Sequence, residues 1–311
     1  MEEGARLVLT TSAAVRAGEK VLVVADDTTR TVGDAFLAAA ESLGADPVLA
    51  LIRPRAADGD EPPIAVGTAM AASDVVVLVT SRSLTHTHAR RAANRAGARV
   101  ISIPGPTEEM LRAGGLATDW SNINDVVRRT GRRLRGSREV HLVSASGTDV
   151  TFSVEGRDWI TEDTGLCPRK GVVTTLPAGE VFVAVLEGTG EGRLVFDGYF
   201  DEPLREPVTA TLSQGRASRI VGAKKAVEAM NRGGTEGRAL GRFGFGLNPR
   251  ARVGGPPLEA EKALGAAHLG FGDNLVIGGK IHCGVHVDGI LSEVGVQVDG
   301  KVIVEKGSLV D

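Results

Sequence analysis

Three of the six histidines in this 311-residue sequence lie close together near its C-terminal end. They are His268, His282 and His286, and Asp288 follows His286 after one residue. If residues 285–289 are extended, His286 and Asp288 point the same way, because strand side chains alternate between two faces. Imidazole and carboxylate ligands suit zinc, iron(II), manganese or cobalt. We therefore expect His286 and Asp288 to bind a metal ion, with His268 as a third ligand.

His282 and Cys283 lie near these residues in the sequence and are weaker candidates for a role in the chemistry. An isolated His-x-Asp pair is structural more often than not, and the nearby His268 is what favours a metal. In an extended segment His282 shares the alternation of His286, but a role beside the ligands or toward the substrate is as good an interpretation as direct ligation. Cys283 is a possible thiol nucleophile, although nothing in the sequence marks it as an acylating centre.

Glu180 is the next candidate for chemistry. A Pro/Gly turn at residues 177–179 delivers its carboxylate to the start of an apolar, strand-like run. Junctions of this kind often carry functional side chains. A solvated turn glutamate is an equally good interpretation of Glu180 alone.

A second polar segment, residues 83–90, follows an apolar run in the first half of the chain. Thr85 is a candidate helix cap there. His86, His88 and Arg90 would then point into the crevice beyond the strand, where open α/β sheets bind ligands. Plain capping and surface polarity explain the same residues equally well.

The elements that must position these residues differ between the two halves of the chain. The first ~130 residues alternate apolar runs with amphipathic stretches, which predicts βαβ units and a parallel, Rossmann-like sheet. The turn at residues 26–30 lacks the dinucleotide fingerprint, so we expect neither NAD nor FAD. Residues 119–134 are expected to form a linking helix. Short β-rich runs follow, so we predict an α/β domain at 1–136 and a β-rich α+β metal-binding domain at 137–311.

Composition excludes several classes of partner. The formal net charge is −3 and aromatic residues are scarce, so neither nucleic acid nor an anionic membrane surface is expected. No apolar stretch reaches the length of a membrane span, and the N-terminus has no apolar signal core. Two widely separated cysteines, Cys167 and Cys283, predict no disulfide framework and suit a reducing cytoplasm.

Several motifs together resemble the thermophilic metallo-aminopeptidase superfamily (aminopeptidase T and S types, leucyl aminopeptidase-like), which also contains the iron-dependent 2,5-dihydroxypyridine 5,6-dioxygenases. The resemblance implies an N-terminal α/β domain, a metal-bearing C-terminal domain and a homodimer. In the aminopeptidase branch it implies two metal ions, with Glu180, His268, His286 and Asp288 at ligand positions. The motifs are residues 83–90, 176–182, 246–252, 261–274 and 286–289.

The sequence departs from the aminopeptidase pattern in two places. Arg242 stands where those enzymes carry a second metal-binding glutamate, and Asp273-Asn274 stand where they place a tyrosine. A cation in place of a carboxylate disfavours a second metal ion by Coulomb repulsion. Two histidines and one aspartate remain, a set associated with mononuclear non-haem iron(II).

Three hypotheses for function follow. The first is an iron(II) ring-cleaving dioxygenase acting on a small hydroxylated aromatic acid, with zinc, cobalt or manganese as other metals. Glu180 would be a base or supplementary ligand, and His86 or His282 would orient substrate or move protons. The second is a metallo-aminopeptidase or amide hydrolase, whose metal activates water. The third is a non-catalytic ligand-binding protein.

Overall fold

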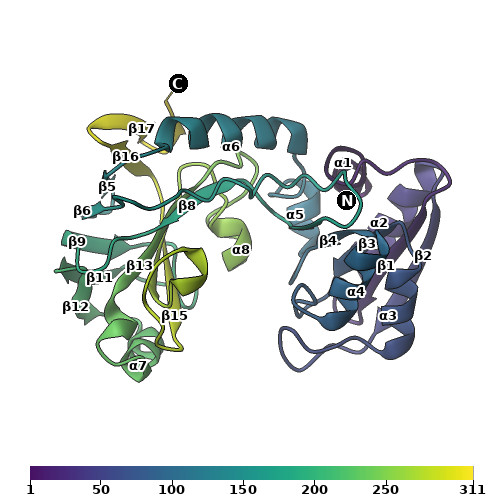
Figure 1. The fold of residues 1–311 in the computed structure, drawn as a ribbon, viewed down its shortest axis with the longest axis horizontal. Coiled ribbons are helices and arrows are strands. Elements are labelled where there is room, and N and C mark those ends of the chain that lie inside the picture. Colours follow the sequence, from purple (N-terminus) through teal and green to yellow (C-terminus); the bar gives the residue numbers. More distant parts are fainter. Residues whose placement is uncertain (311) are drawn as a thin grey trace. The chain divides into compact units, whose positions relative to one another are not determined.

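The structure, a computed structural model, describes residues 1–310. Its helices and strands (Figure 1) fall into two compact units. The first comprises Met1–Asp125 and Asp163–Ala178, and the second comprises Val126–Glu162 and Gly179–Asp311. The chain therefore returns to the first unit after it has entered the second. The sequence predicted two continuous domains, 1–136 and 137–311, and did not predict that residues 163–178 return to the first unit.

The first unit is built on a five-stranded parallel sheet with strand order β2-β1-β3-β4-β7. The central strands are runs of valine, leucine and alanine, as expected where both faces of a parallel sheet are buried. The return segment supplies β7, which the sequence did not predict. The strands are β1 (Lys20–Asp26), β2 (Asp46–Ile52), β3 (Val75–Val79), β4 (Arg99–Ser102) and β7 (Val173–Thr175).

Helices connect these strands. Helix α4 begins at His88, and the hydroxyl of Thr87 accepts a hydrogen bond from the Arg90 N–H. The capping role expected for Thr85 was therefore wrong; its hydroxyl lies 2.7 Å from that of Ser102 instead. The helical segments of this unit are α1 (Glu2–Leu7), the π-helical turn Val8–Ser12, α2 (Arg30–Ser42), α3 (Ile64–Ala71), α4 (His88–Ala96) and α5 (Glu108–Arg112).

The predicted linking helix is α6 (Trp120–Leu134), which runs from the last residues of the first unit into the second. The second unit contains an antiparallel five-stranded sheet with strand order β10-β15-β14-β13-β8. We call it the site sheet. Its strands are β8 (Glu180–Ala184), β10 (Tyr199–Phe200), β13 (Leu240–Gly246), β14 (Ala267–Gly272) and β15 (His286–Leu291).

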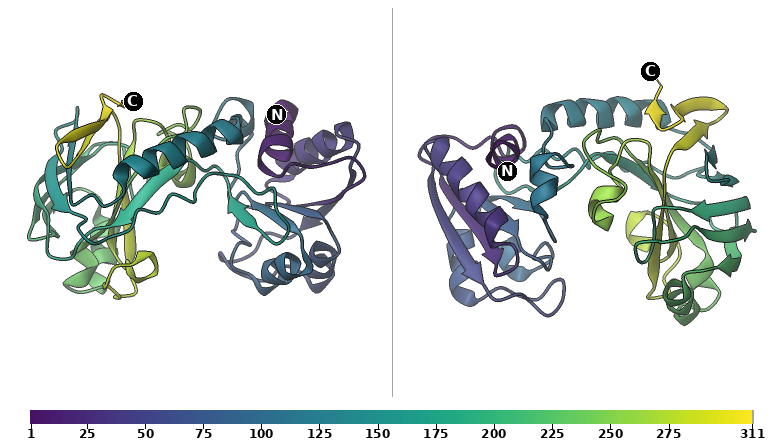
Figure 2. Two further views of the ribbon diagram at one scale, coloured as in Figure 1. Left: turned by 45° about the horizontal axis from the view of Figure 1, so that its top comes forward. Right: turned by 180° about the vertical axis from the view of Figure 1, so that it is seen from behind.

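An eight-stranded sheet with strand order β12-β11-β9-β6-β5-β16-β17-β18 accompanies the site sheet. Figure 2 shows the strands of this unit, teal to yellow, from two further directions. Its strands are β5 (Glu139–Ser144), β6 (Asp149–Ser153), β9 (Glu191–Phe196), β11 (Val208–Ser213), β12 (Arg216–Val221), β16 (Val294–Val298), β17 (Lys301–Glu305) and β18 (Ser308–Leu309). The helical segments are α7 (Lys224–Arg232), the turn Glu236–Arg238, α8 (Pro257–Ala260) and the turn Leu275–Ile277.

Aromatic side chains form the core between the two sheets. On β13 the ring of Phe243 packs edge-on against Phe152 of β6, with centroids 5.1 Å apart. On β14 the ring of Phe271 meets Phe196 of β9 at 6.2 Å. Side chains alternate along a strand. On β13 and β14 the residues next to these phenylalanines therefore point to the opposite face of the site sheet.

The predicted fold class, an α/β unit with a parallel sheet followed by a β-rich α+β unit, is confirmed. No helix within residues 1–310 has the length and apolar character to cross a membrane.

The return segment gives a test of the first unit. Gly165 has φ +74°, and a Cβ there would lie 2.3 Å from Cε3 of the fully buried Trp120. Gly165→Ala is expected to lower the free energy of unfolding by about 1–3 kcal/mol more than Gly18→Ala, because the added methyl group overpacks the ring. Denaturant unfolding of both variants measures the difference.

Gly18 is the matched control because its φ is +76° and no atom of residues 1–310 lies within 4 Å of its added Cβ. Equal destabilisation by the two substitutions would show that backbone strain alone, and not the contact with Trp120, limits position 165.

Candidate metal centre

One face of the site sheet collects the predicted site residues. His268 of β14 pairs with Gly244 of β13, and Asp288 of β15 pairs with Gly270 of β14. Residues paired across neighbouring strands lie on the same face of a sheet. By this register Glu180 and Arg242 also lie on the face that carries His268 and Asp288.

Two glycines make room for these side chains. A Cβ on Gly244 would lie 2.3 Å from Cε1 of His268, so the imidazole rests directly on the backbone of β13. A Cβ on Gly270 would lie 2.8 Å from Cε1 of His286 and 3.0 Å from Oδ1 of Asp288. The site face is therefore a shallow cradle of bare backbone that any larger residue would fill.

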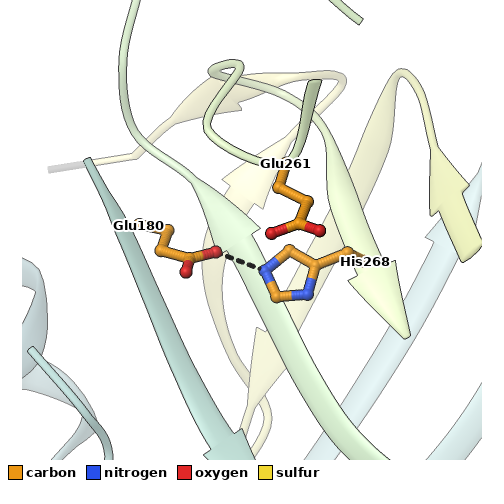
Figure 3. A group of neighbouring side chains, drawn as sticks. All are labelled: Glu180, Glu261 and His268. Atoms are coloured by element: carbon orange, nitrogen blue, oxygen red, sulfur yellow. Dashed lines mark ion pairs between the residues drawn. The ribbon is translucent and has the colours of Figure 1, made fainter. Parts of the chain in front are cut away.

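A compact group of possible metal ligands lies at one end of this face (Figure 3). Within residues 1–310 it comprises Glu180, Glu261 and His268, which offer ligand atoms all within 4.8 Å of one another. Oε2 of Glu180 lies 2.6 Å from Nε2 of His268. Neither imidazole nitrogen of the fully buried His268 has a hydrogen-bond partner of standard geometry in the described chain.

These unsatisfied buried atoms fit a metal ion. Buried polar atoms are normally hydrogen-bonded, so an imidazole and a carboxylate oxygen without such partners need another explanation. A divalent cation bound by His268 and a neighbouring carboxylate would satisfy them, and the nitrogen and oxygen donors match the preferences of iron, zinc, manganese and cobalt.

Two buried side-chain cations neutralise the carboxylates of this group. Nζ of Lys262 lies 2.7 Å from Oε1 of Glu180 and 3.4 Å from Oε2 of Glu261. Nη2 of Arg242 lies 3.0 Å from Oε1 of Glu180 and 3.8 Å from Oε2 of Glu261. The guanidinium also stacks on Phe182, 4.4 Å from the ring centre.

The residues around Glu180 determine its charge. Burial alone would raise the pKa of Glu180, but Lys262, Arg242 and His268 outweigh it and hold that pKa well below the usual value. Glu180 is thus an anion at neutral pH and a weak proton acceptor. Of its two predicted roles, this geometry favours a ligand or a fixed negative charge over a general base.

His286 and Asp288 form a second pair on the same face. Nε2 of His286 lies 3.0 Å from Oδ1 of Asp288. The hydrogen bond that His286 donates to Asp288 raises the pKa of His286 against the opposing effect of burial. Burial would raise the pKa of Asp288, but the hydrogen bond and charge of His286, with Arg242 and His268, lower it. The pair lies outside the compact group of Glu180, Glu261 and His268.

The other predicted residues lie in less constrained places. His282 precedes β15 in a connection that is not a strand, so the alternation argument for it was wrong. Its side chain is 75% exposed, with Nδ1 3.5 Å from Oδ1 of Asp273. His86 belongs to the first unit, where it is exposed in the turn before α4.

Sequence reasoning missed Glu261 and Lys262. Both belong to the motif at residues 261–274 that also contains His268. Helix α8 ends at Ala260, and bridges from Gly246 to Leu264 and from Asn248 to Ala263 bring the following turn against β13. Two charged residues directly before a run of small apolar ones were the available signal.

Comparisons with known proteins show what the chain is similar to. A family model described as NicX, 2,5-dihydroxypyridine 5,6-dioxygenase, matches residues 5–311. No curated protein matches the chain. Among solved structures, a 2,5-dihydroxypyridine dioxygenase from Pseudomonas putida KT2440 is 22% identical, with TM-score 0.73 over 99% of this chain and 96% of the other. Wild-type AmpT from Thermus thermophilus is 18% identical, with TM-score 0.67 over 100% and 98%. The predicted superfamily is confirmed.

The glycine cradle predicts how the site is lost without loss of the fold. Gly244→Ala is expected to displace the His268 ring and weaken metal binding, because the new methyl group occupies the position of Cε1. Metal content after dialysis against a fixed metal concentration measures the effect. Gly254→Ala is the control, since nothing in residues 1–310 lies within 4 Å of an added Cβ there. Unchanged metal content in Gly244→Ala would contradict a role for His268.

The His286–Asp288 pair predicts a titration. In the metal-free protein the pKa of His286 is expected to lie above its usual value and to fall in Asp288→Asn, because the carboxylate hydrogen bond is the main cause of the shift. The pair stabilises the fold below the unfolded-state pKa of histidine, and this stability is lost as pH rises through the raised pKa of His286.

NMR titration of the imidazole resonances measures this pKa. Asp149→Asn is the control, because Asp149 forms a comparable 2.8 Å pair with His141 on the other sheet. A His286 pKa that is the same in Asp288→Asn and in the unsubstituted protein would show that the two side chains are not bonded in solution.

Proposed function

Because the chain belongs to the family of 2,5-dihydroxypyridine 5,6-dioxygenases (NicX), an enzyme family, we propose that it is a mononuclear iron(II) dioxygenase that opens the ring of a small hydroxylated aromatic compound. The observation that carries the proposal is the placement of His268, His286 and Asp288 on one face of the site sheet, above the backbone of two glycines. We assign these three side chains as ligands. Two histidines and one carboxylate leave coordination positions free for substrate and dioxygen.

The assignment of Asp288 rather than Glu261 rests on their partners. Glu261 and Glu180 already face the side-chain cations Lys262 and Arg242. Asp288 is bonded to His286, an imidazole that gives up a proton when it binds a metal ion. A cation can therefore take the place of that proton between His286 and Asp288 without leaving a buried charge unpaired.

The side chains around the ion have separate roles in this proposal. A bound iron(II) ion would supply the redox chemistry that brings dioxygen and the ring together. Glu180 contributes a fixed negative charge, because Lys262 and Arg242 hold it ionised. The Arg242 guanidinium, held flat on Phe182, is a donor that can face an oxygen substituent of the substrate.

A second candidate function has one observation in its favour. Glu180, Glu261 and His268 form a group with two carboxylates, which suits the metal-activated water of a hydrolase such as an aminopeptidase. Arg242 and Lys262 count against it, since they place two positive charges beside those carboxylates and would repel a second ion. The non-catalytic ligand-binding hypothesis disagrees with membership in an enzyme family. The predicted homodimer and cytoplasmic location stay predictions.

Metal analysis and oxygen uptake test the proposal. Protein purified anaerobically and loaded with iron(II) is expected to hold one ion per chain and to consume dioxygen with 2,5-dihydroxypyridine. Removal of a residue that contacts a ligand typically lowers metal affinity roughly 10–100-fold. His286→Ala removes a ligand itself, so its metal affinity is expected to fall by more than that. Glu261→Gln is the comparison, and it should keep the ion.

The opposite pattern would favour the hydrolase. Two zinc, cobalt or manganese ions per chain in the unsubstituted protein, loss of metal in Glu261→Gln, and peptidase activity would together exclude the dioxygenase assignment.

A further inference from the structure

The connection between β14 and β15 holds one predicted ligand in a defined orientation. It begins at Asp273, whose backbone carbonyl lies 3.2 Å from Nδ1 of His286. When Nδ1 carries a hydrogen, this contact is a hydrogen bond, and Nε2, which lies 3.0 Å from Asp288, becomes available to a metal ion when it gives up its own proton. The carboxylate of Asp273 accepts hydrogen bonds from the backbone N–H groups of Cys283 and Gly284. Asp273 thus closes the connection with its carboxylate and contacts the His286 ring with its backbone carbonyl.

Asn274 fastens the same connection to β13. It is fully buried, and its Oδ1 accepts a hydrogen bond from the N–H of Ile281 at 2.8 Å. Its Nδ2 donates to the carbonyl of Gly241 at 3.1 Å. The pairing of β13 with β14 shifts register between Leu240 and Arg242, so Gly241 is the extra residue of a bulge. Bulges redirect neighbouring side chains, and Asn274 therefore holds the backbone position that sets the direction of Arg242.

A third set of contacts holds the far end of the connection. Oε1 of Glu187 accepts a hydrogen bond from the N–H of Lys280 at 2.7 Å and another from Nδ2 of Asn274 at 3.3 Å. Arg157 pairs with Glu187 and donates to the carbonyl of Gly278. Although the tip of the connection is exposed, its backbone is tied to β13, to Glu187 and to Arg157.

We propose that Asp273 and Asn274 are positioning residues for the metal centre, Asp273 for His286 and Asn274 for Arg242. The proposal rests on the proposed function, since it takes His286 as a ligand. A ligand ring that is already held by a hydrogen bond to its other nitrogen loses less freedom when it binds the ion, and such outer contacts commonly account for 10–100-fold in metal affinity.

A merely structural role must be separated from this one. The chain offers a matched carboxylate in Asp299, which lies between β16 and β17. Its Oδ1 accepts hydrogen bonds from the backbone N–H groups of Arg138 and Glu139, at 3.0 and 2.9 Å. Removing the carboxylate of Asp299 breaks the same kind of contact on the other sheet, away from the metal centre.

The experiment compares Asp273→Ala, Asp273→Asn and Asp299→Ala in the full chain. Anaerobic titration with cobalt(II) gives the metal dissociation constant, and the cobalt absorption bands report the ligand set. Asp273→Ala is expected to weaken cobalt binding about 10–100-fold and to change the bands, because the connection whose Asp273 carbonyl contacts the His286 ring is no longer fixed by the carboxylate. Asp273→Asn keeps an acceptor oxygen for the two N–H groups and should restore most of the affinity. Asp299→Ala is expected to lower the melting temperature but to leave affinity and bands unchanged.

Each outcome decides one question. Unchanged affinity and bands in Asp273→Ala, or an equal loss in Asp299→Ala, would overturn the positioning role while the wild-type metal site stands. A wild-type protein that binds no cobalt and no iron would instead defeat the proposed function, and the positioning role with it. If Asp273→Ala does not fold, Asp273→Ser takes its place; its shorter acceptor should give an intermediate loss, and wild-type affinity would again overturn the proposal.

Discussion

The buried carboxylate of Glu180 is the interaction on which the second unit depends. An ionised carboxylate that loses its partners inside a protein costs several kcal/mol, so the surrounding chain has to supply positive charge. It does so with Lys262 and Arg242, which both lie beside one oxygen, while the other oxygen lies 2.6 Å from Nε2 of His268. These residues come from the turn after α8, from β13 and from β14, so the charge balance of Glu180 joins three parts of the chain.

This charge balance also shapes the chemistry of the face. Glu180 and Glu261 are shared between two cations, which suits a fixed electrostatic environment beside a metal ion. The positive charge between His286 and Asp288 comes only from the proton of their hydrogen bond. A metal ion can replace that proton. The same face thus keeps the ion pairs of Glu180 and can exchange the proton between His286 and Asp288 for a bound metal ion.

The two faces of the site sheet divide structure from function. Phe243 and Phe271 point to the face that packs on the eight-stranded sheet, where aromatic contacts supply the core. Gly244 and Gly270, each next to one of these phenylalanines, face the site and carry no side chain that could fill it. A strand that alternates phenylalanine with glycine therefore builds a rigid floor and an open surface at once.

The sequence by itself determined the fold class and named the candidate residues for the chemistry. Apolar runs separated by amphipathic helices predicted the parallel sheet, because period and composition are local properties. The His-x-Asp spacing placed His286 and Asp288 on one face, since strand alternation is also local. Only the tertiary structure decided what surrounds them. The pairing of β7 with β4, the turn that brings Glu261 and Lys262 to Glu180, and the bulge at Gly241 depend on contacts between distant segments. His282 was misplaced for the same reason: whether a segment is a strand depends on hydrogen bonds to a neighbouring strand, and Asp273 and Asn274 hold that segment in another shape.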